Sequence, residues 1–258
     1  MNFNRKNNVR LIALLFVYAL SLGICQGQDK TDSIKMHPYK NIVRYNLSGA
    51  LVFGADRYIV FGYERVIRKN QSISINFGKA SLPKLITVST DSLELSKNSS
   101  ASGYNVSIDY RVYISRENKY PAPHGLYIGP YYSYNKFTRD NQWDYIYAST
   151  NNSVMTHSTI SIHTIGFELG YQFIFWKRLT LDLLMVGPGI GIYDYKNKIE
   201  SNVDPATREQ LIEGFKQLLT QKFPGMNFVF ANKEIDSNGS LNTTSLGYRY
   251  LIQIGINF

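Results

Sequence analysis

The sequence predicts an all-β protein, an eight-stranded antiparallel up-and-down barrel that crosses a membrane through its strands. Eight segments alternate apolar and polar residues with a period of two, as strands with one apolar face do. Tyr (20) and Phe (14) contribute to an aromatic fraction of 14%, which suits strands and interfacial girdles. A mean hydropathy of -0.22 argues against a bundle of membrane helices but permits a barrel, because half of each barrel strand faces a polar lumen.

The closing segment, Ser245 to Phe258, shows the alternation most fully. Every second residue from Leu246 to Phe258 is apolar or aromatic, and the residues between them are mostly small or polar. Seven earlier segments repeat the pattern. In chain order, the predicted strands are Asn41–Phe53, Arg57–Ile67, Ser72–Lys79, Tyr104–Ile114, 125–137, 159–175, 179–195 and 245–258.

The segment Tyr104–Ile114 sets the scale of the barrel. Its 11 residues, at a rise of ~3.3 Å and a tilt of ~45°, would span ~26 Å, close to the ~25 Å apolar band of a membrane barrel. The connections give an independent test, because extracellular connections are long and periplasmic ones short. Long connections are predicted at 80–103, 138–158 and 196–244, with only 54–56 breaking the alternation.

Two prolines conflict with an ideal barrel. Pro130 and Pro188 lie inside predicted strands, where a closed sheet offers no free edge for a residue without an N–H group. The apolar phase also changes after Met185. A β-bulge near Gly187 would accommodate Pro188 and the phase change and would point the glycines of this stretch inward.

The first residues have the features of a secretory signal peptide. Basic residues precede an apolar run from Leu11 to Ile24, and cleavage is predicted after Gly27. Cys25 leaves a lipoprotein alternative open, although the bulky Ile24 departs from the lipidation motif. The predicted order is therefore signal peptide 1–27, periplasmic lead-in 28–40 and outer-membrane barrel 41–258.

Five stretches carry a resemblance to a known family: the signal peptide, NIVRYNL at 41–47, FGYER at 61–65, GLYIGP at 125–130 and IGINF at 254–258. With them the chain resembles the small outer-membrane β-barrels of the OmpA and OmpX type, in particular the stand-alone barrels of Bacteroidetes. The resemblance implies a monomer in the cell outer membrane that contacts lipopolysaccharide and the barrel assembly machinery. It implies an assembly signal on the closing strand, carried by Tyr250, Ile254, Ile256 and Phe258. The sequence shows no peptidoglycan-binding domain after the barrel, so a tethering role is not expected.

Charged residues on the inward face of the strands are the first candidate site. Three bases nearly balance four acids, as a buried network requires. A structural plug is favoured over a gated conducting path, because unpaired buried charge is costly and eight strands leave an interior that side chains can fill. The predicted lumen network comprises Arg44, Glu64, Asp109, Arg111, Glu168, Asp182 and Arg249.

The last long connection contains a predicted amphipathic helix. Asp204 supplies an N-cap, Pro205 the first helical position, and Phe223-Pro224-Gly225 the end. Packing against the protein's own loops is favoured, whereas an exposed apolar face would indicate a binding site for an extracellular protein or glycan. The contact face comprises Leu211, Ile212, Phe215, Leu218 and Leu219.

Two serine–histidine combinations leave a lipid-acting hydrolase open, resembling lipid A deacylases. They are His157 with Ser158, and Ser161 with His163, near the outer rim. No acidic third member is placed, so solvated or interfacial histidines are favoured.

Cofactors and nucleic acid are not expected. The sequence has no phosphate-binding glycine loop, metal-ligand cluster or dinucleotide fingerprint. Removing 1–27 would change the net charge from +9 to 9 − 3 = +6, without a clustered basic stripe. The predicted function is therefore a non-enzymatic, structural or surface-interaction role through the extracellular loops, with the hydrolase and a narrow channel as alternatives.

Overall fold

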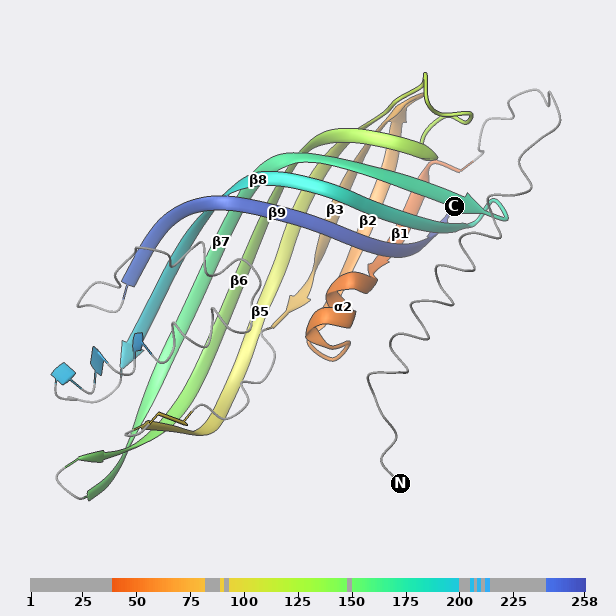
Figure 1. The fold of residues 1–258 in the computed structure, drawn as a ribbon. Coiled ribbons are helices and arrows are strands. Elements are labelled where there is room, and N and C mark those ends of the chain that lie inside the picture. Colours follow the sequence, from red (N-terminus) through yellow and green to blue (C-terminus); the bar gives the residue numbers. More distant parts are fainter. Residues whose placement is uncertain are drawn as a thin grey trace, which may run out of the picture. The chain divides into compact units, whose positions relative to one another are not determined.

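The strands form a closed antiparallel ring. The computed structural model describes residues 39–81, 89–90, 93–147, 150–199, 205–206, 208–209, 212–213 and 240–258, all within one compact unit, Met36–Phe258. Sheet order is β3-β2-β1-β9-β8-β7-β6-β5-β4, and an additional pairing of β3 with β5 closes eight strands into a barrel (Figure 1). This confirms the predicted fold class. No helix among the described residues is long and apolar enough to cross a membrane.

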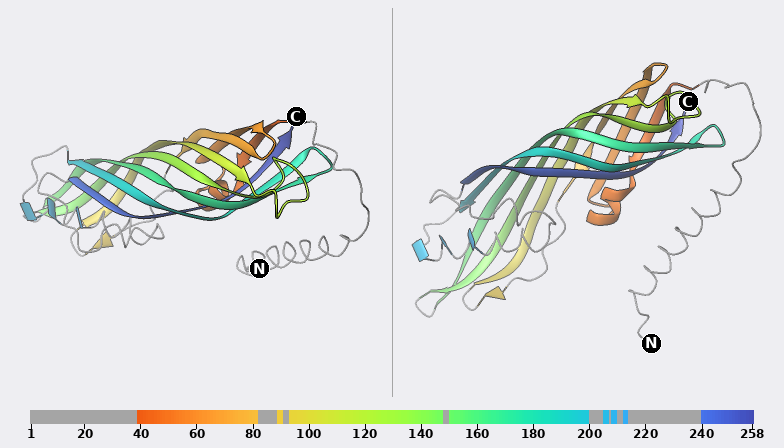
Figure 2. Two further views of the ribbon diagram at one scale, coloured as in Figure 1. Left: turned by 90° about the horizontal axis from the view of Figure 1, so that it is seen from above. Right: turned by 45° about the horizontal axis from the view of Figure 1, so that its top comes forward.

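The ring strands differ greatly in length. Figures 1 and 2 show β5 to β8 running well beyond the far ends of β1 to β3. The short strand β4, Ser89–Thr90, pairs only with the start of β5. The ring strands are β1 Asn41–Asn46, β2 Tyr58–Arg68, β3 Gln71–Ala80, β5 Leu93–Tyr113, β6 Gly125–Tyr147, β7 Thr150–Phe175, β8 Leu179–Ile199 and β9 Ser240–Asn257.

The strand register fixes the tilt of the barrel. Followed from partner to partner around the ring, Val43 leads to Leu246, whereas its direct partner on β9 is Ile256, so the shear is 256 − 246 = 10 residues. Ten residues of shear over eight strands incline the strands by roughly 40°. At ~3.3 Å per residue and that tilt, the path climbs ~25 Å along the barrel axis.

Every side chain on this path is apolar or aromatic and exposed. The path therefore traces a continuous apolar exterior, whose height matches the ~25 Å apolar band of membrane barrels. In ring order its members are Val43, Tyr63, Ile75, Ile108, Tyr132, Ile165, Ile190 and Leu246.

The interior has the opposite character. Among the described residues, buried polar and charged side chains outnumber buried apolar ones, and fully enclosed residues include Arg44 and Arg111. Soluble domains place polar groups outside and apolar groups inside. Here the two surfaces of the sheet are exchanged, as expected where the outside faces hydrocarbon.

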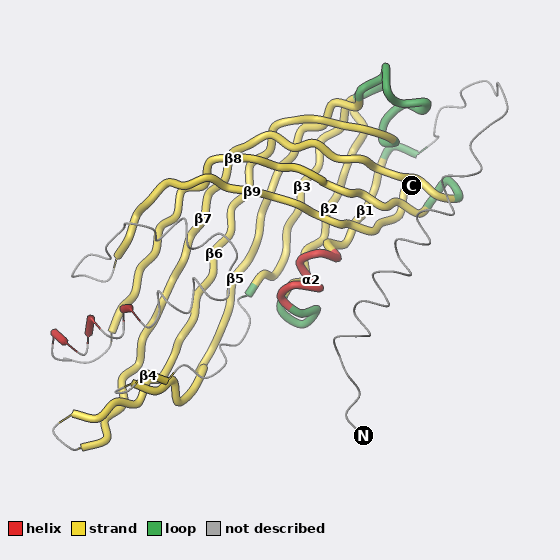
Figure 3. Tube along the Cα trace, viewed as in Figure 1, coloured by secondary structure: helices red, strands yellow, loops and turns green. Residues whose placement is uncertain are grey.

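The prediction of one strand over Asn41–Phe53 is wrong in its second half. β1 ends at Asn46, and helix α2, Leu47–Phe53, follows (Figure 3). The Asn46 side chain caps this helix by accepting a hydrogen bond from the Gly49 N–H at 2.9 Å. Gly54, at φ +99, ends it and donates its N–H to the Ala50 carbonyl at 2.9 Å.

Helix α2 leaves part of the β9 edge without a strand partner. The pairing of β1 with β9 ends at Asn46 and Gln253, although β9 continues outward to Ser240. The next donor on this edge, the Ile252 N–H, bonds instead to the Ser48 hydroxyl of α2 at 3.2 Å. Helix α2 thus occupies the wall position that the outer half of β1 would have taken.

The predicted long connections are shorter than expected. Segments 93–103, 138–147, 150–158 and 240–244 belong to strands rather than to loops. The predicted strand ends were those of the apolar–polar alternation, and this alternation stops where the outer face of the barrel ceases to be apolar. Antiparallel hydrogen bonding needs only a partner strand, so the polar ladder of β6 and β7 continues to Tyr147 and Thr150.

The predicted β-bulge is present. The register of β8 against β9 shifts between Leu184 and Gly187, and both intervening residues, Met185 and Val186, are exposed. Pro188 points outward, as the change of phase requires. At Pro130, β5 and β6 keep the same register before and after the proline, but the pairing is interrupted between Asp109–Tyr131 and Val112–Ile128.

Several predictions fall largely outside the described residues. Of the lead-in 28–40, only Tyr39 and Lys40 are described, and the signal peptide 1–27 lies outside. Residues 205–206, 208–209 and 212–213 are helical, consistent with the predicted helix start. Ile212 is half-buried, and the rest of the predicted contact face lies outside the described residues, namely Leu211, Phe215, Leu218 and Leu219.

The fit of α2 against β2 depends on Gly49. A Cβ atom there would lie 2.1 Å from the Tyr58 ring, which is stacked on Phe53 at a centroid separation of 5.6 Å. Gly49→Ala should therefore lower the free energy of unfolding by roughly 1–3 kcal/mol, although Ala favours helix by ~1 kcal/mol. Urea unfolding in lipid vesicles measures this. Leu51→Ala, on the exposed face, should be nearly neutral, and a neutral Gly49→Ala would show that Tyr58 is free to move.

Candidate functional site

All seven residues of the predicted lumen network meet inside the barrel. Four of them form the first cluster. Arg44 Nη1 lies 2.9 Å from Glu64 Oε2 and 2.6 Å from Asp182 Oδ2. Arg111 reaches the same two carboxylates, at 2.8 Å to Asp182 and 3.5 Å to Glu64. Strands β1, β2, β5 and β8 are thereby joined across the lumen.

Uncharged partners complete this cluster. Tyr113 donates to Glu64 and Tyr127 to Asp182, each at 2.8 Å. The Arg111 guanidinium also lies over the Tyr127 ring, 4.3 Å from its centroid. Gln172 Oε1 accepts from Arg44 at 3.2 Å and from Arg111 at 3.3 Å. The carboxylates thus receive hydrogen bonds as well as charge, which a buried ion pair needs.

The remaining three charges form the second cluster. Arg249 of β9 lies 2.5 Å from Asp109 and 3.4 Å from Glu168, and donates to the Ser107 hydroxyl at 3.1 Å. Its guanidinium stands over the Tyr131 ring, 4.9 Å from the centroid.

Arg111 connects the two clusters. Its Nε lies 3.3 Å from Glu168, and its Nη2 lies 3.9 Å from Asp109. Six of the seven charged side chains have at most 1% of their surface exposed, and Arg249 has 12%. Side chains therefore fill the cross-section of the lumen at this level.

Sequence reasoning found the charged members but missed the uncharged ones. Gln172 shares the inward parity of Glu168 on β7, and Tyr113 shares that of Arg111 on β5, so that parity would have found both. Tyr127 lies on β6, which contributes no charged residue to the network. Asn76 links the second cluster to β9, because it donates to Asp109 at 3.1 Å and accepts from Gln253 at 3.1 Å.

The two serine–histidine combinations do not form catalytic pairs. Ser158 is buried and donates to Asn197 at 3.1 Å, whereas its neighbour His157 is exposed on the other face of β7. Ser161 and His163 share the outer face, but His163 Nδ1 lies 2.8 Å from the Tyr132 hydroxyl. No hydrogen bond joins a serine to a histidine among the hydrogen bonds found in the described part of the chain.

His157 instead belongs to a polar group on the outer wall. Its Nδ1 lies 2.5 Å from Asp140, and the Ser100 hydroxyl donates to the other Asp140 oxygen at 2.6 Å. These hydrogen bonds, that of Ser100 first, hold the pKa of Asp140 below its usual range. Ser100 therefore contacts the Asp140 carboxylate rather than the His157 imidazole. A hydrolase would need a serine hydroxyl hydrogen-bonded to the histidine, and this group has only the histidine and its carboxylate partner.

The predicted assembly residues lie on the outer face of β9. Tyr250, Ile254 and Ile256 are exposed, and Phe258 follows the strand. Phe258 exchanges two backbone hydrogen bonds with Asn41, at 2.8 and 3.0 Å, which close β9 against β1. No group of three or more His, Cys, Asp or Glu side chains in the described segments could hold a metal ion.

Fold and interior together define a closed eight-stranded barrel with a charged, filled lumen and an apolar exterior. No protein-family model and no curated protein matches this chain. Among solved structures, the chain is similar to the crystal structure of CarO2 from Acinetobacter baumannii, with 11% sequence identity and a TM-score of 0.37. That match covers 86% of this chain and 97% of CarO2. The barrel assignment rests on the strand pairing rather than on this match.

The network predicts a large difference between two aspartates of β8. Asp182→Leu removes the nearer of the two carboxylates that Arg44 and Arg111 share, leaves both guanidiniums to Glu64, and should lower the free energy of unfolding by about 3–5 kcal/mol. Asp194→Leu is the matched control, because Asp194 is partly exposed and its ion-pair partner within the described residues is Lys196, at 3.3 Å. An exposed pair contributes at most ~1 kcal/mol. Equal effects in urea unfolding would contradict a structural role for the network.

Proposed function

We propose that this protein is an integral outer-membrane barrel of the small OmpA and OmpX type, with a structural or surface-interaction role. The exterior supports a membrane location most strongly. A ~25 Å apolar path over all eight strands would be unfavourable in water, and closed barrels are the only sheets that satisfy their backbone groups in lipid.

The two ends of the barrel support an orientation. Short connections, 69–70, 114–124 and 176–178, gather at the end where Phe258 lies. At the other end, β5 to β8 extend past the apolar exterior. In outer-membrane barrels short turns are periplasmic and long connections extracellular. The extended strands are then the part of the protein that faces the cell surface.

The filled lumen supports a non-conducting role. The charged side chains are paired with one another and are fully enclosed except for Arg249, which is 12% exposed, so they leave no route for ions through either cluster at rest. A narrow channel would require these pairs to separate, at the cost of several desolvated charges. We therefore place the function on the surface of the extended strands and their connections, which would meet lipopolysaccharide and an extracellular protein or glycan.

The membrane assignment is tested by the gel mobility of the purified protein. A folded membrane barrel resists detergent at room temperature, so the unheated sample should migrate differently from the boiled one. The protein should also stay with the membrane during a carbonate wash. A protein that shows no mobility shift and is extracted by carbonate is not an integral barrel.

The absence of lipid hydrolase activity is a separate prediction. Because His157 contacts Asp140 and His163 contacts Tyr132 rather than a serine, His157→Ala and His163→Ala should leave the lipid A mass spectrum unchanged. Cells that lack the protein are the reference. Deacylated lipid A that disappears in either variant and in those cells would establish the hydrolase instead.

A further inference from the structure

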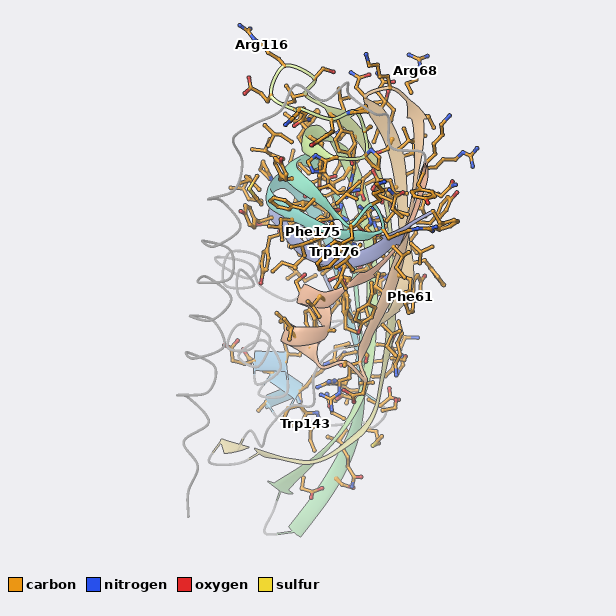
Figure 4. The ribbon with its side chains drawn as sticks, turned by 90° about the vertical axis from the view of Figure 1, so that its right-hand side faces the viewer. Phe61, Arg68, Arg116, Trp143, Phe175 and Trp176 are labelled. Carbon is orange, nitrogen blue, oxygen red and sulfur yellow. The ribbon has the colours of Figure 1, made fainter. Side chains whose placement is uncertain are left out.

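The short-turn end of the barrel carries a strongly basic rim. Arg68 and Arg116 mark this end in Figure 4, opposite Trp143. The only acidic side chain among the described residues of the three turns and the segment before β1 is Glu117. Six bases of the same segments stand against it, and the end of β2 adds Arg65 and Arg68. The eight rim bases are Lys40, Arg65, Arg68, Lys69, Arg116, Lys119, Lys177 and Arg178.

These bases differ from those of the lumen in having no acidic partner. Each arginine of the two lumen clusters touches two or more carboxylates, whereas none of the eight rim bases forms an ion pair with a described residue. Arg178 lies over the Tyr39 ring at 4.3 Å, and Arg65 donates to the Asn41 side chain at 3.2 Å. The positive charge of the rim is therefore available to an anion.

A cavity of about 220 Å³ lies within this rim. Lys40, Arg68 and Lys69 line it together with apolar side chains, among them Val66 and Pro121. Backbone hydrogen bonds fix the three segments that form it. The Val66 N–H donates to the Lys40 carbonyl at 2.8 Å, and the Ala122 N–H donates to the Lys69 carbonyl at 3.0 Å. The cavity is thus built by ordered backbone and is lined by three basic residues together with apolar ones.

Exposed apolar and aromatic side chains surround the rim. Ile67 lines the cavity and is exposed, and Phe175, Trp176 and Phe258 are exposed at the same end. Amphipathic rings and cations together are typical of the boundary between membrane and water. A free anion or an acidic peptide in water would not need this apolar border. A lipid headgroup would contact both the basic residues and the apolar side chains around them.

We infer that this cavity binds the headgroup of an anionic phospholipid, of the phosphatidylglycerol class, in the leaflet at the short-turn end. The inference rests on the proposed membrane location. Lys40, Arg68 and Lys69 neutralise the phosphate, and the apolar walls contact the glycerol and the first carbons of the acyl chains. The volume fits a headgroup and leaves the chains in the membrane.

Native mass spectrometry of the full chain in detergent tests this, with phosphatidylglycerol and phosphatidylcholine as probes. Phosphatidylglycerol should bind at least about tenfold more tightly. Each cation near an anionic lipid contributes about fivefold, so Lys40→Gln/Arg68→Gln/Lys69→Gln should weaken binding by roughly a hundredfold. Lys136→Gln/Lys196→Gln/Lys198→Gln removes the same charge from the other end and should leave binding unchanged.

Equal binding of the two lipids, or an equal loss in both triple variants, would overturn the inference. Displacement of the lipid by millimolar inorganic phosphate would assign a soluble phosphate site instead, and displacement by an oligoglutamate would assign an acidic peptide. The gel mobility of each sample is measured in parallel. A normal mobility shift without lipid selectivity refutes only this inference, whereas loss of the shift in the unaltered chain refutes the membrane barrel.

Discussion

The contact of two arginines with one aspartate is the interaction on which the barrel depends most. Arg44 and Arg111 both reach Asp182, at 2.6 and 2.8 Å, from strands that are far apart in the ring. Hydrogen bonds between neighbouring strands define a sheet, but they do not hold opposite walls of a barrel together. The charged clusters provide that connection mainly through ion pairs and hydrogen bonds, because most large apolar side chains are on the outside.

The same exchange of surfaces explains how polar residues can form a core. A buried charge is costly in isolation, and the interior avoids this cost by giving each carboxylate several donors. Glu64 forms ion pairs with Arg44 and Arg111 and accepts a hydrogen bond from Tyr113. The Tyr127 ring stacks against the Arg111 guanidinium, and the Tyr131 ring against that of Arg249. Because its charged members come from different strands, the network also favours the strand register that brings them together.

The sequence predicted well which residues face into the barrel, but it did not predict which of those residues contact one another. Arg44, Asp109 and Arg249 are inward because the period of a strand is two, whatever its neighbours. Which of them meet depends on the shear, and that is set by turns and by the bulge at Leu184 and Gly187. Uncharged members such as Gln172 share this inward parity with the charged residues of their strands.

The two errors have different physical causes. In Leu47–Phe53 the residues also alternate, so a strand was predicted, yet Asn46 is a good N-cap and Gly49 admits the Tyr58 ring, and together these favour a helix. In the outer parts of β6 and β7 no apolar face is needed, so the strands continue where the sequence pattern ends.

The short length of β1 limits the strand pairing that closes the ring. Because α2 begins at Leu47, β1 has only Asn41–Asn46 with which to join β2 to β9, and the outer edge of β9 gains no strand from it. Arg44 lies within this short pairing and is the residue through which β1 reaches the lumen network. The charged interior therefore does more than fill space, since it fastens the strand at which the ring closes. A barrel held in this way can dispense with strand pairing in the outer half of that seam. It keeps its long, polar surface on β5 to β8, on the opposite side of the ring, where the proposed interactions take place.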